Sequence, residues 1–365
     1  MRMNNIKSAL IIGFTLGCLS LSAQGTSTPY SPGITQDAVS YWLPKTKLKV
    51  TVTTTKRTFT PGEFSRYAER YLRLSGVKDQ PEEYWEITGI TVSTYGAPDK
   101  NHLYTLGFPQ KGNRPYFELT KDGILAAINT HPQNEQVEET PAIQATETQV
   151  KINPQDYMTE EILMAGSTAK MAELTAKEIY NIRESRNAIT RGQADFIPTD
   201  GESVKIMLES LSKQETALLA LFSGTTEQKE RVFTIEVNPD RPLTKQILFR
   251  FSTKLGVLAI DNLAGEPVWI DLTDNKMFDN KGQESTGKKS KSSVKKDSGP
   301  FLYYRIPGTA TLNIYNNRKS FLEQDVQIAQ FGKVEVLSSS IMGKHADTKI
   351  TFDTATGNVL NINGK

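Results

Sequence analysis

Residues 120–129 read TKDGILAAIN, and residues 253–262 read TKLGVLAIDN. Each stretch places a glycine, Gly123 or Gly256, before a short apolar run. Glycine takes up positive φ without steric cost, so each stretch predicts a tight turn that leads into a strand. A looser third version, KITFDTATGNVLNI, occupies residues 349–362. The repeat predicts a fold built from antiparallel hairpins, and either an old domain duplication or a convergence of similar hairpins would produce it.

Periodic side-chain patterns outside these hairpins predict further strands and helices. Residues 47–54, KLKVTVTT, alternate as a half-buried strand does. Helices are expected at 60–76, beginning with the capping sequence TPGEF, at 159–190, and at 200–224. We therefore predict an α+β, β-rich fold of mainly antiparallel sheets, with a central helical hairpin and one N-terminal helix packed on sheet faces. Additional separate strands are predicted at 85–92, 102–108, 116–119, 233–237 and 247–251.

The first residues have the pattern of a secretory signal peptide. Arg2 and Lys7 precede an apolar run at 8–21, and the small residue Ala23 stands where a signal peptidase would cut. The run is too short for a confident transmembrane helix. We therefore expect an exported protein of a Gram-negative cell, periplasmic or associated with the outer membrane, whose mature chain begins near Gln24 and has no transmembrane segment.

Cys18 is the only cysteine and lies inside this run. The preceding TLG is a poor version of a lipobox, so lipid anchoring at Cys18 is the less favoured alternative. Cleavage after Ala23 would leave a mature chain without thiols or disulfides. The sequence leaves open on which side of the outer membrane the protein lies.

Changes in composition divide the chain into segments. Residues 131–155 are rich in acidic residues, Gln, Thr and Pro, and residues 281–298 carry six lysines and almost no apolar side chain. The first part of the chain is predicted to consist of a signal peptide at 1–23, an N-terminal α+β domain at 24–130 and an acidic linker at 131–155. A second domain with the helical hairpin is predicted at 156–280. It is followed by a disordered Lys-rich loop at 281–298 and by a β segment at 299–365 that continues the second domain.

The overall charge argues against two classes of partner. Lys and Arg total 43 and Asp and Glu total 41, so no strong field attracts nucleic acid or an acidic membrane surface. The hydrophobic share of 37% and the charged share of 23% are those of an ordinary globular protein. No nucleic-acid partner is predicted.

The sequence lacks the motifs of common hydrolases. It contains no GxSxG elbow, no HExxH motif and no complete Walker loop. Ser167 and Lys170 fit the SxxK spacing of penicillin-binding proteins, but that spacing recurs elsewhere, for example at Ser75 and Lys78, and the companion KTG motif is absent. We predict no catalytic residue, no cofactor-binding residue and no cofactor.

Spacing also gives no metal site. The three histidines show no pairing along a helix or hairpin that would converge on one ion. Three aspartates cluster after a predicted strand but match no EF-hand loop, so turn formation is favoured and calcium binding is left open. No metal-binding residue is predicted. The histidines are His102, His131 and His345, and the aspartates are Asp271, Asp274 and Asp279.

Single polar and aromatic side chains have structural roles as their first interpretation. Glu215 interrupts the apolar seam of the second long helix, and we expect it to lie at the boundary and reach water. Aromatic residues in strands are more often core residues than exposed platforms for sugars. The candidates for such a platform are Trp42, Trp85, Trp269, Tyr303 and Tyr304.

Several short landmarks together resemble a known family. They are YWLPKT at 41–46, TPGEF with YAERYL at 60–72, YYRIPG at 303–308, IAQFG at 328–332 and FDTATGNVL at 352–360. They resemble a family of exported proteins from Bacteroides-type bacteria that is defined only as a domain of unknown function. The resemblance spans nearly the whole mature chain and implies compartment and lineage, but no reaction and no residue role.

These observations favour an exported, non-catalytic cell-envelope protein that acts as a binding or assembly module for a protein or a glycan. The alternative is a periplasmic hydrolase with an unfamiliar site of Asp, Glu and Tyr side chains. A hydrolase should bring ionisable groups with perturbed pKa values together in a pocket, whereas a binding module should show a shallow aromatic or apolar patch. The oligomeric state is left open.

Overall fold

The computed structural model describes residues 32–34, 38–107, 115–132, 153–196, 198, 200–278, 302–337 and 348–363. These residues belong to one compact unit that starts at Pro32. The predicted signal peptide, the Lys-rich loop and most of the predicted acidic linker lie outside the described residues. Those predictions, and the division of the chain into two domains, stay predictions.

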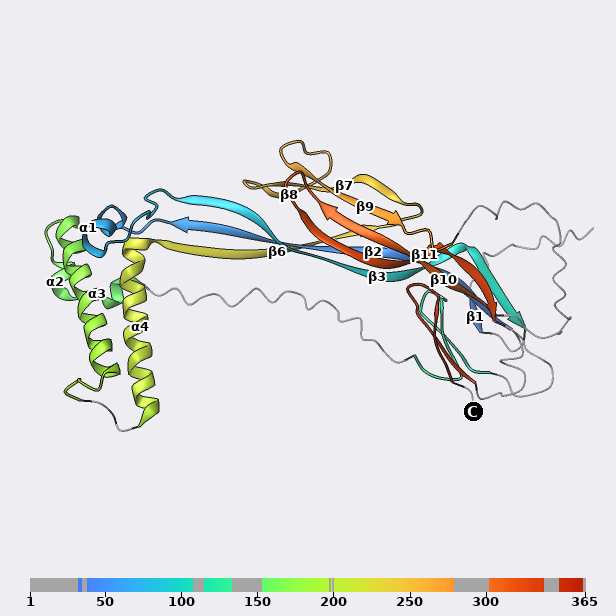
Figure 1. The fold of residues 1–365 in the computed structure, drawn as a ribbon, viewed down its shortest axis with the longest axis horizontal. Coiled ribbons are helices and arrows are strands. Elements are labelled where there is room, and N and C mark those ends of the chain that lie inside the picture. Colours follow the sequence, from blue (N-terminus) through green and yellow to red (C-terminus); the bar gives the residue numbers. More distant parts are fainter. Residues whose placement is uncertain are drawn as a thin grey trace, which may run out of the picture. The chain divides into compact units, whose positions relative to one another are not determined.

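The described part is rich in strands, and the named strands pair antiparallel, as the sequence predicts (Figure 1). In sheet A, β2 (Ala38–Thr60) has β3 (Glu82–Gly107) on one side and both β1 (Gly33–Ile34) and β6 (Thr225–Val237) on the other. Sheet B has the order β13 (Val359–Asn363), β12 (Lys349–Phe352), β5 (Leu125–Ile128), β4 (Phe117–Leu119). Sheet C has the order β11 (Ser320–Leu337), β10 (Leu302–Tyr315), β9 (Glu266–Asp274), β7 (Leu243–Ser252), β8 (Gly256–Leu258).

β3 corrects the sequence prediction of separate strands at 85–92 and 102–108, because one strand spans both. The intervening segment contains Gly96 and Pro98, two residue types that are rare inside strands. In the structure Pro98 lies opposite Pro44 of β2, next to a register shift between Trp42 and Pro44. Two facing residues that lack an N–H leave no donor unpaired, so the strand passes through the prolines.

Two apolar cores hold the three sheets together. One lies between sheets A and C and contains Leu48 and Val50 of β2 together with Ile270 of β9 and Leu312 of β10, all fully buried. The other joins the first residues of β2 to sheet B and to Leu302 of β10. Burying a large apolar side chain contributes about 1.5–3 kcal/mol, so both clusters stabilise the packing of the sheets.

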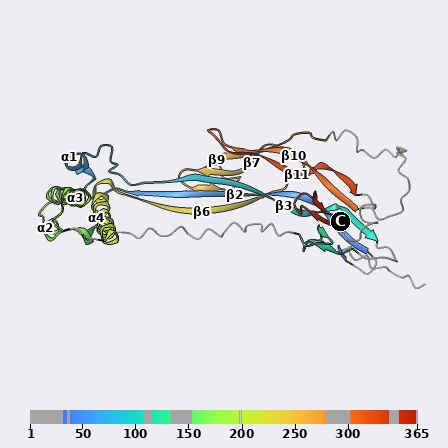
Figure 2. The ribbon, with the colours of Figure 1, turned by 60° about the horizontal axis from the view of Figure 1, so that its bottom comes forward.

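The helices pack on one another and not on a sheet, which corrects the prediction that they lie on sheet faces (Figures 1 and 2). Their buried cluster contains only residues of helices and of the segment that leads into η1. The adjoining half of β6, TTEQKER at 225–231, is polar on both faces and offers no apolar surface to cover. The helices are η1 (Ser65–Tyr67), α1 (Ala68–Leu72), η2 (Pro154–Tyr157), α2 (Glu160–Leu163), α3 (Thr168–Thr190) and α4 (Gly201–Ser223).

The N-terminal helix is shorter than the predicted span 60–76. Thr60 is still a strand residue, paired with Thr225 of β6, and does not cap a helix. The chain then crosses α4, where the Phe64 N–H donates to the Leu221 carbonyl at 2.7 Å. α1 ends at Leu72 because the next residue, Arg73, has a left-handed φ of 59°.

The helix predicted at 159–190 is divided in two. Thr159 caps α2, and Ser167 caps α3 by accepting a hydrogen bond from the Lys170 N–H at 3.3 Å. Gly166 lies in the break, where a residue of low helix propensity weakens continuation. The helix predicted at 200–224 is confirmed as α4, and Asp200 caps it by accepting from the Ser203 N–H at 2.7 Å.

The two repeated stretches form turns, as predicted, but in different sheets. Gly123 has φ 77° before β5 of sheet B, and Gly256 has φ 82° at the start of β8 of sheet C. Residues 125–128 are all buried, whereas the second copy leaves the sheet after Leu258. The two copies therefore share the glycine turn, but the residues after the turn are buried in the first copy and partly exposed in the second.

Candidate functional site

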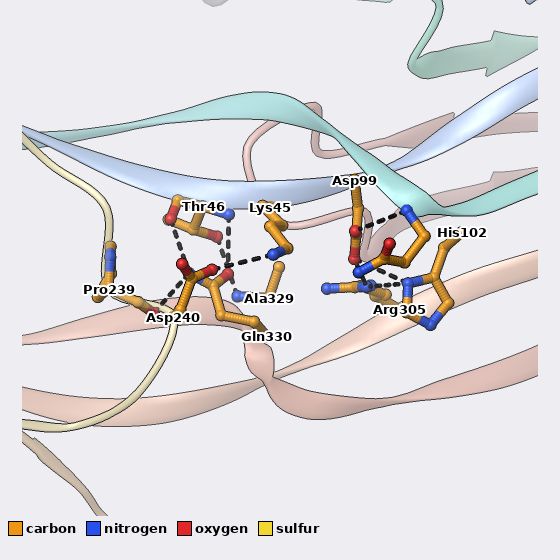
Figure 3. Close-up of polar contacts among 10 residues, drawn as sticks. Lys45, Thr46, Asp99, His102, Pro239, Asp240, Arg305, Ala329 and Gln330 are labelled. Atoms are coloured by element: carbon orange, nitrogen blue, oxygen red, sulfur yellow. Dashed lines mark hydrogen bonds and ion pairs between the residues drawn. The ribbon is translucent and has the colours of Figure 1, made fainter.

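Four landmark stretches of the sequence meet at one place, which we call the three-sheet junction. Figure 3 shows its side chains on β2, β3, β10 and β11. It consists of Thr46 on β2, Asp99 on β3, Arg305 on β10, Gln330 on β11, and the turn 353–358 between β12 and β13. YWLPKT, YYRIPG, IAQFG and FDTATGNVL supply all of these parts except Asp99. Because the parts belong to sheets A, B and C, their contacts tie the three sheets together.

Thr46 and Gln330 close a gap at the edge of sheet A. The pairing of β6 with β2 stops at Leu48, and the Gln330 amide takes the place of the next rung. Its Oε1 accepts from the Thr46 N–H at 2.9 Å, and its Nε2 donates to the Thr46 carbonyl at 2.9 Å. The Thr46 hydroxyl donates to the Ala355 carbonyl and accepts from the Ala329 N–H, each at 2.9 Å. One threonine therefore links β2 to β11 and to the β12–β13 turn.

A buried ion pair lies at the other end of the junction. Asp99 is 2% exposed and Arg305 is 4% exposed, and the Arg305 Nη2 donates to the Asp99 Oδ2 at 2.5 Å. The His102 side chain is 37% exposed, and its Nδ1 lies 2.8 Å from the same carboxylate oxygen. With its proton on Nδ1 the ring donates to Asp99, and its other nitrogen points away from the carboxylate (Figure 3).

The neighbours of Asp99 favour its ionised form. Burial opposes ionisation because it removes water from the charge. The Asn101 N–H, the His102 ring and the Arg305 guanidinium together outweigh that effect, so the pKa of Asp99 lies below its ordinary value. In the described part of the chain, the Arg305 Nε is the one buried side-chain nitrogen or oxygen without a hydrogen-bond partner.

Stacked tyrosines continue from the ion pair toward sheet B. Tyr104 and Tyr303 stack with ring centroids 4.2 Å apart, and the Tyr41 hydroxyl donates to the Tyr303 carbonyl at 3.0 Å. Burial raises the pKa of Tyr41 and the pKa of Tyr104. These hydroxyl groups therefore stay protonated at neutral pH.

Two glycines allow the backbones to approach closely at the junction. A Cβ on Gly96 of β3 would collide with the Thr354 carbonyl of the β12–β13 turn. A Cβ on Gly332 of β11 would collide with the Ile306 carbonyl of β10. In both cases the obstacle is backbone, which cannot rotate away. The landmarks near these positions are therefore explained by packing and by buried hydrogen bonds.

The outer face of sheet C consists of partly exposed side chains, in contrast to the buried contacts of the junction. On β9 and β10, fully buried residues of the inner core alternate with half-exposed residues that point away from sheet A. Trp269 and Tyr315 are cross-strand neighbours whose ring centroids lie 5.7 Å apart. We define this outer face by Trp269, Asp271 and Thr273 of β9, Thr311, Asn313 and Tyr315 of β10, and Glu323 and Asp325 of β11.

Hydrogen bonds on the outer face join neighbours within the sheet. The Tyr315 hydroxyl donates to the Asp271 Oδ2 at 3.0 Å, and burial together with this bond raises the pKa of Tyr315. The Thr311 hydroxyl donates to the Asp325 Oδ1 at 2.7 Å. Asn313 accepts from the Ser320 hydroxyl at 2.8 Å. Each of these groups keeps further hydrogen-bonding capacity toward solvent.

Glu215 lies in a second charged cluster, between α3 and α4. It is 7% exposed, and its two carboxylate oxygens accept from Arg183 at 2.6 Å and from Arg186 at 2.7 Å. The prediction that Glu215 reaches water is therefore wrong. Two arginines one turn apart on α3 hold the carboxylate, and the α4 sequence alone does not reveal them.

The remaining polar candidates from the sequence do not converge. Asp271 and Asp274 are three residues apart on β9, so they point to opposite faces, and Asp279 lies outside the described residues. His131 contacts Glu118 and not His102, and His345 is not among the described residues. No group of three or more His, Cys, Asp or Glu in the described ranges is arranged to hold a metal ion.

The five aromatic candidates occupy separate environments. Trp85 is buried, with Arg231 placed over its ring, and Trp42 borders the turn at Gly123. Tyr303 belongs to the tyrosine stack of the junction, and Tyr304 borders the core that joins β2 to sheet B. Of the five, only Trp269 lies on the outer face of sheet C.

Sequence reasoning missed the Asp99–Arg305 pair, because its members lie 206 residues apart. The available signal was indirect: YYRIPG, which contains Arg305, was one of the landmark stretches. Of the Trp269–Tyr315 pair, the sequence identifies Trp269 as an aromatic candidate but gives no signal for Tyr315. In the helices that the structure describes, none is long and apolar enough to cross a membrane.

A family model described as Domain of unknown function (DUF4831) matches residues 37–360. No curated protein and no solved structure matches the chain. The matched span includes the three-sheet junction, the outer face of sheet C and the helices. The chain therefore belongs to the DUF4831 family.

Proposed function

We propose that the protein is an exported, non-catalytic cell-envelope protein that binds a neutral glycan on the outer face of sheet C. The observation that carries the proposal is the Trp269–Tyr315 ring pair, which adjoins Asp271 and Asn313 on the face turned away from sheet A. Aromatic rings and hydrogen-bond acceptors stand side by side there, and Ile247 of β7 is the neighbour of Trp269 on its other side.

The chemistry of this face suits a sugar. A sugar ring offers apolar C–H groups on its faces and hydroxyl groups around its edge. Aromatic rings supply large apolar contact area at small entropic cost, which suits the C–H groups. Carboxylate and amide oxygens accept hydrogen bonds from hydroxyl donors, and charged acceptors form the stronger bonds. Asp271 and Asn313 are neighbours in register and could receive adjacent hydroxyl groups.

The charges of the outer face favour a neutral ligand over an acidic one. The eight residues that define the face include three carboxylates, Asp271, Glu323 and Asp325, and no basic side chain. Like charges across an interface disfavour association. A glycan rich in uronic acid or sulfate would therefore bind more weakly than an uncharged one of the same size.

Tryptophan fluorescence provides a test, because the chain has three tryptophans. Neutral and acidic oligosaccharides are screened with the folded protein, and the neutral hits are titrated. Trp269→Ala should weaken binding at least about tenfold, which corresponds to roughly 1.4 kcal/mol. Trp42→Phe removes a half-buried indole from another place and should leave binding unchanged. Equal binding by Trp269→Ala and the parent protein, or binding of acidic glycans alone, would refute the proposal.

Export is supported by the sequence of the N-terminal segment. Arg2 and Lys7 before the apolar run at 8–21 are typical of a signal peptide. Mass spectrometry of the protein recovered from the envelope should show a mature chain that begins at Gln24. A diacylated chain that begins at Cys18 would establish lipid anchoring instead, and an intact Met1 in a cytoplasmic fraction would rule out export.

One observation favours a hydrolase as a second candidate. The Asp99 carboxylate orients the half-exposed His102 ring, which is the arrangement of a general base and its positioning acid. Turnover of peptide, ester or glycoside substrates that His102→Ala abolishes, with unfolding unchanged, would establish this candidate. Absence of turnover alongside glycan binding would favour the binding module.

A further inference from the structure

β13 is an edge strand of sheet B with one side unpaired in the described part of the chain. Its partner on the paired side is β12, with Ile350 opposite Ile362 and Thr351 opposite Asn361. An edge strand presents N–H and C=O groups that can pair with another strand. The dark red end of the chain lies beside the C-terminal label in Figure 1.

An apolar row crosses sheet B and ends uncovered on β13. Phe117, Ile128, Ile350 and Ile362 are cross-strand neighbours in successive strands, so their side chains share one face. Their exposed fractions are 3%, 0%, 0% and 43% in that order. Leu360, on the same strand as Ile362, is 62% exposed. The face that forms a core on three strands is thus open on the fourth.

β13 also lacks the charges that protect other edges. Residues 354–364 contain no Asp, Glu, Lys or Arg. The other described edge strands longer than three residues, which are β3, β6 and β11, all carry charged side chains along their length. Charged residues on an edge hinder pairing with a second chain. β13 has an apolar face and no charged side chain along its length, and its pairing with β12 shifts register once, between Thr351 and Phe352.

The sequence of β13 is complementary to itself. In an antiparallel pair of two VLNIN strands centred on Asn361, Leu360 of each copy lies opposite Ile362 of the other. The central Asn361 residues face each other, and their amides can exchange hydrogen bonds. No like charges meet in this arrangement. A two-fold axis through the pair makes the interface closed and symmetric.

We propose that β13 pairs antiparallel with β13 of a second copy of the chain, joining the two four-stranded B sheets into one. The pair extends the apolar row across the two-fold axis and covers Ile362 on both copies. Main-chain hydrogen bonds supply affinity and the apolar row supplies register, as in other cases of strand addition. The short strand gives a dimer that dissociates on dilution.

Sedimentation velocity over a series of protein concentrations tests the pairing. The parent protein should pass from monomer to dimer as concentration rises. Ile362→Lys places a charge at the edge and should raise the dissociation constant at least about tenfold. Leu263→Lys makes the same kind of change at an apolar residue that is 80% exposed in the loop before β9, and it should leave the dimer intact. A monomer at every concentration overturns the proposal.

A cross-linking variant locates the interface independently. In the full chain with Cys18→Ser, Asn361→Cys carries the only thiol. Facing residues of an antiparallel pair have Cβ atoms about 4.5–5.5 Å apart, close enough for a disulfide after small adjustments. Mild oxidation should give a disulfide-linked dimer, while Leu263→Cys should give none. A dimer that persists in Ile362→Lys and is not cross-linked at 361 would place the interface elsewhere.

Discussion

The three-sheet junction and the outer face of sheet C use the same strands for opposite purposes. Arg305 and Asn313 both lie on β10, yet Arg305 is buried against β3 and Asn313 faces outward. Junction side chains bond between sheets, whereas outer-face side chains bond to neighbours within one sheet. Four of the five landmark stretches meet at the junction, and the fifth, at 60–72, lies in the helical cluster. The described contacts of those four stretches are architectural, and the ligand face that we propose lies outside them.

The largest effect expected from this contrast follows the loss of a buried charge. Arg305→Met leaves the Asp99 carboxylate buried beside the His102 ring, without its guanidinium partner. Removing one member of a buried pair typically costs about 3–5 kcal/mol. Urea unfolding should show a loss of this size.

The companion variant separates charge from packing. Asp99→Asn combined with Arg305→Met removes both charges, so the double variant should be more stable than Arg305→Met alone. Equal stability of the single and double variants would mean that Arg305 contributes through shape and not through its charge.

A smaller loss of stability is expected when a side chain is added at Gly332, where two backbones approach closely. The added Cβ of Gly332→Ala collides with the Ile306 carbonyl of β10, and neither backbone can move without distorting a ladder. Overpacking of this kind costs roughly 3 kcal/mol. The measurement is the shift of the urea midpoint at constant m-value.

Gly89→Ala is the matched control for Gly332→Ala. Gly89 also lies in a long strand, but the nearest atom to its added Cβ is the Thr53 Cβ at 3.7 Å, an ordinary contact. Its effect should stay below about 1 kcal/mol. If both alanine variants lose the same stability, glycine at 332 serves no close approach and the account of the junction is wrong.

These contrasts show how far sequence reasoning reached. The β-rich antiparallel architecture, the glycine turns at 123 and 256, and the Asp200 cap follow from patterns within a few residues, where local sterics decide. Four landmark stretches supply most of the junction contacts, but no pattern within a single stretch indicates which stretches meet in the fold.

The failures share one physical cause, which is a partner distant in the sequence. The strand predicted at 85–92 continues through Pro98 because Pro44 lies opposite it. Glu215 appears misplaced on an apolar seam until Arg183 of the other helix reaches it. The sequence predicts helices on a sheet because an apolar helix face must be buried. The half of β6 next to the helices is polar, so it offers them no apolar surface, and they pack on one another.

The pH dependence of stability gives a further, more modest test of the junction. The pKa of Asp99 is lowered in the folded state, so its ionisation contributes stability above its unfolded pKa of about 3.9. That contribution is lost as the pH falls below this value and through the lower folded pKa. The urea midpoint of the parent protein should therefore fall in this acidic range.

Two variants assign that acid sensitivity. Asp99→Asn should be less stable near neutral pH and should show a flatter profile below about pH 4. Asp240→Asn alters an exposed carboxylate, 71% exposed and paired with Lys45, and should keep the parent profile. A parent-like acid slope in Asp99→Asn would exclude this carboxyl group as the source.

The smallest effect on stability is expected on the outer face of sheet C, where a change in binding should accompany it. Asn313→Ala removes one hydrogen bond, from the Ser320 hydroxyl at 2.8 Å, in a strand pair that keeps its backbone ladder. A substitution at such a site usually alters stability by no more than about 0.5 kcal/mol. If the face binds a glycan, the lost amide also removes an oxygen acceptor and two N–H donors from beside the aromatic pair, so affinity should fall while the urea midpoint barely moves. The junction predicts the reverse for Gly332→Ala: stability falls, and affinity per folded molecule is kept. If the Asn313→Ala variant loses as much stability as the Gly332→Ala variant, the outer face contributes to stability as the junction does. The contrast between the two regions would then be wrong.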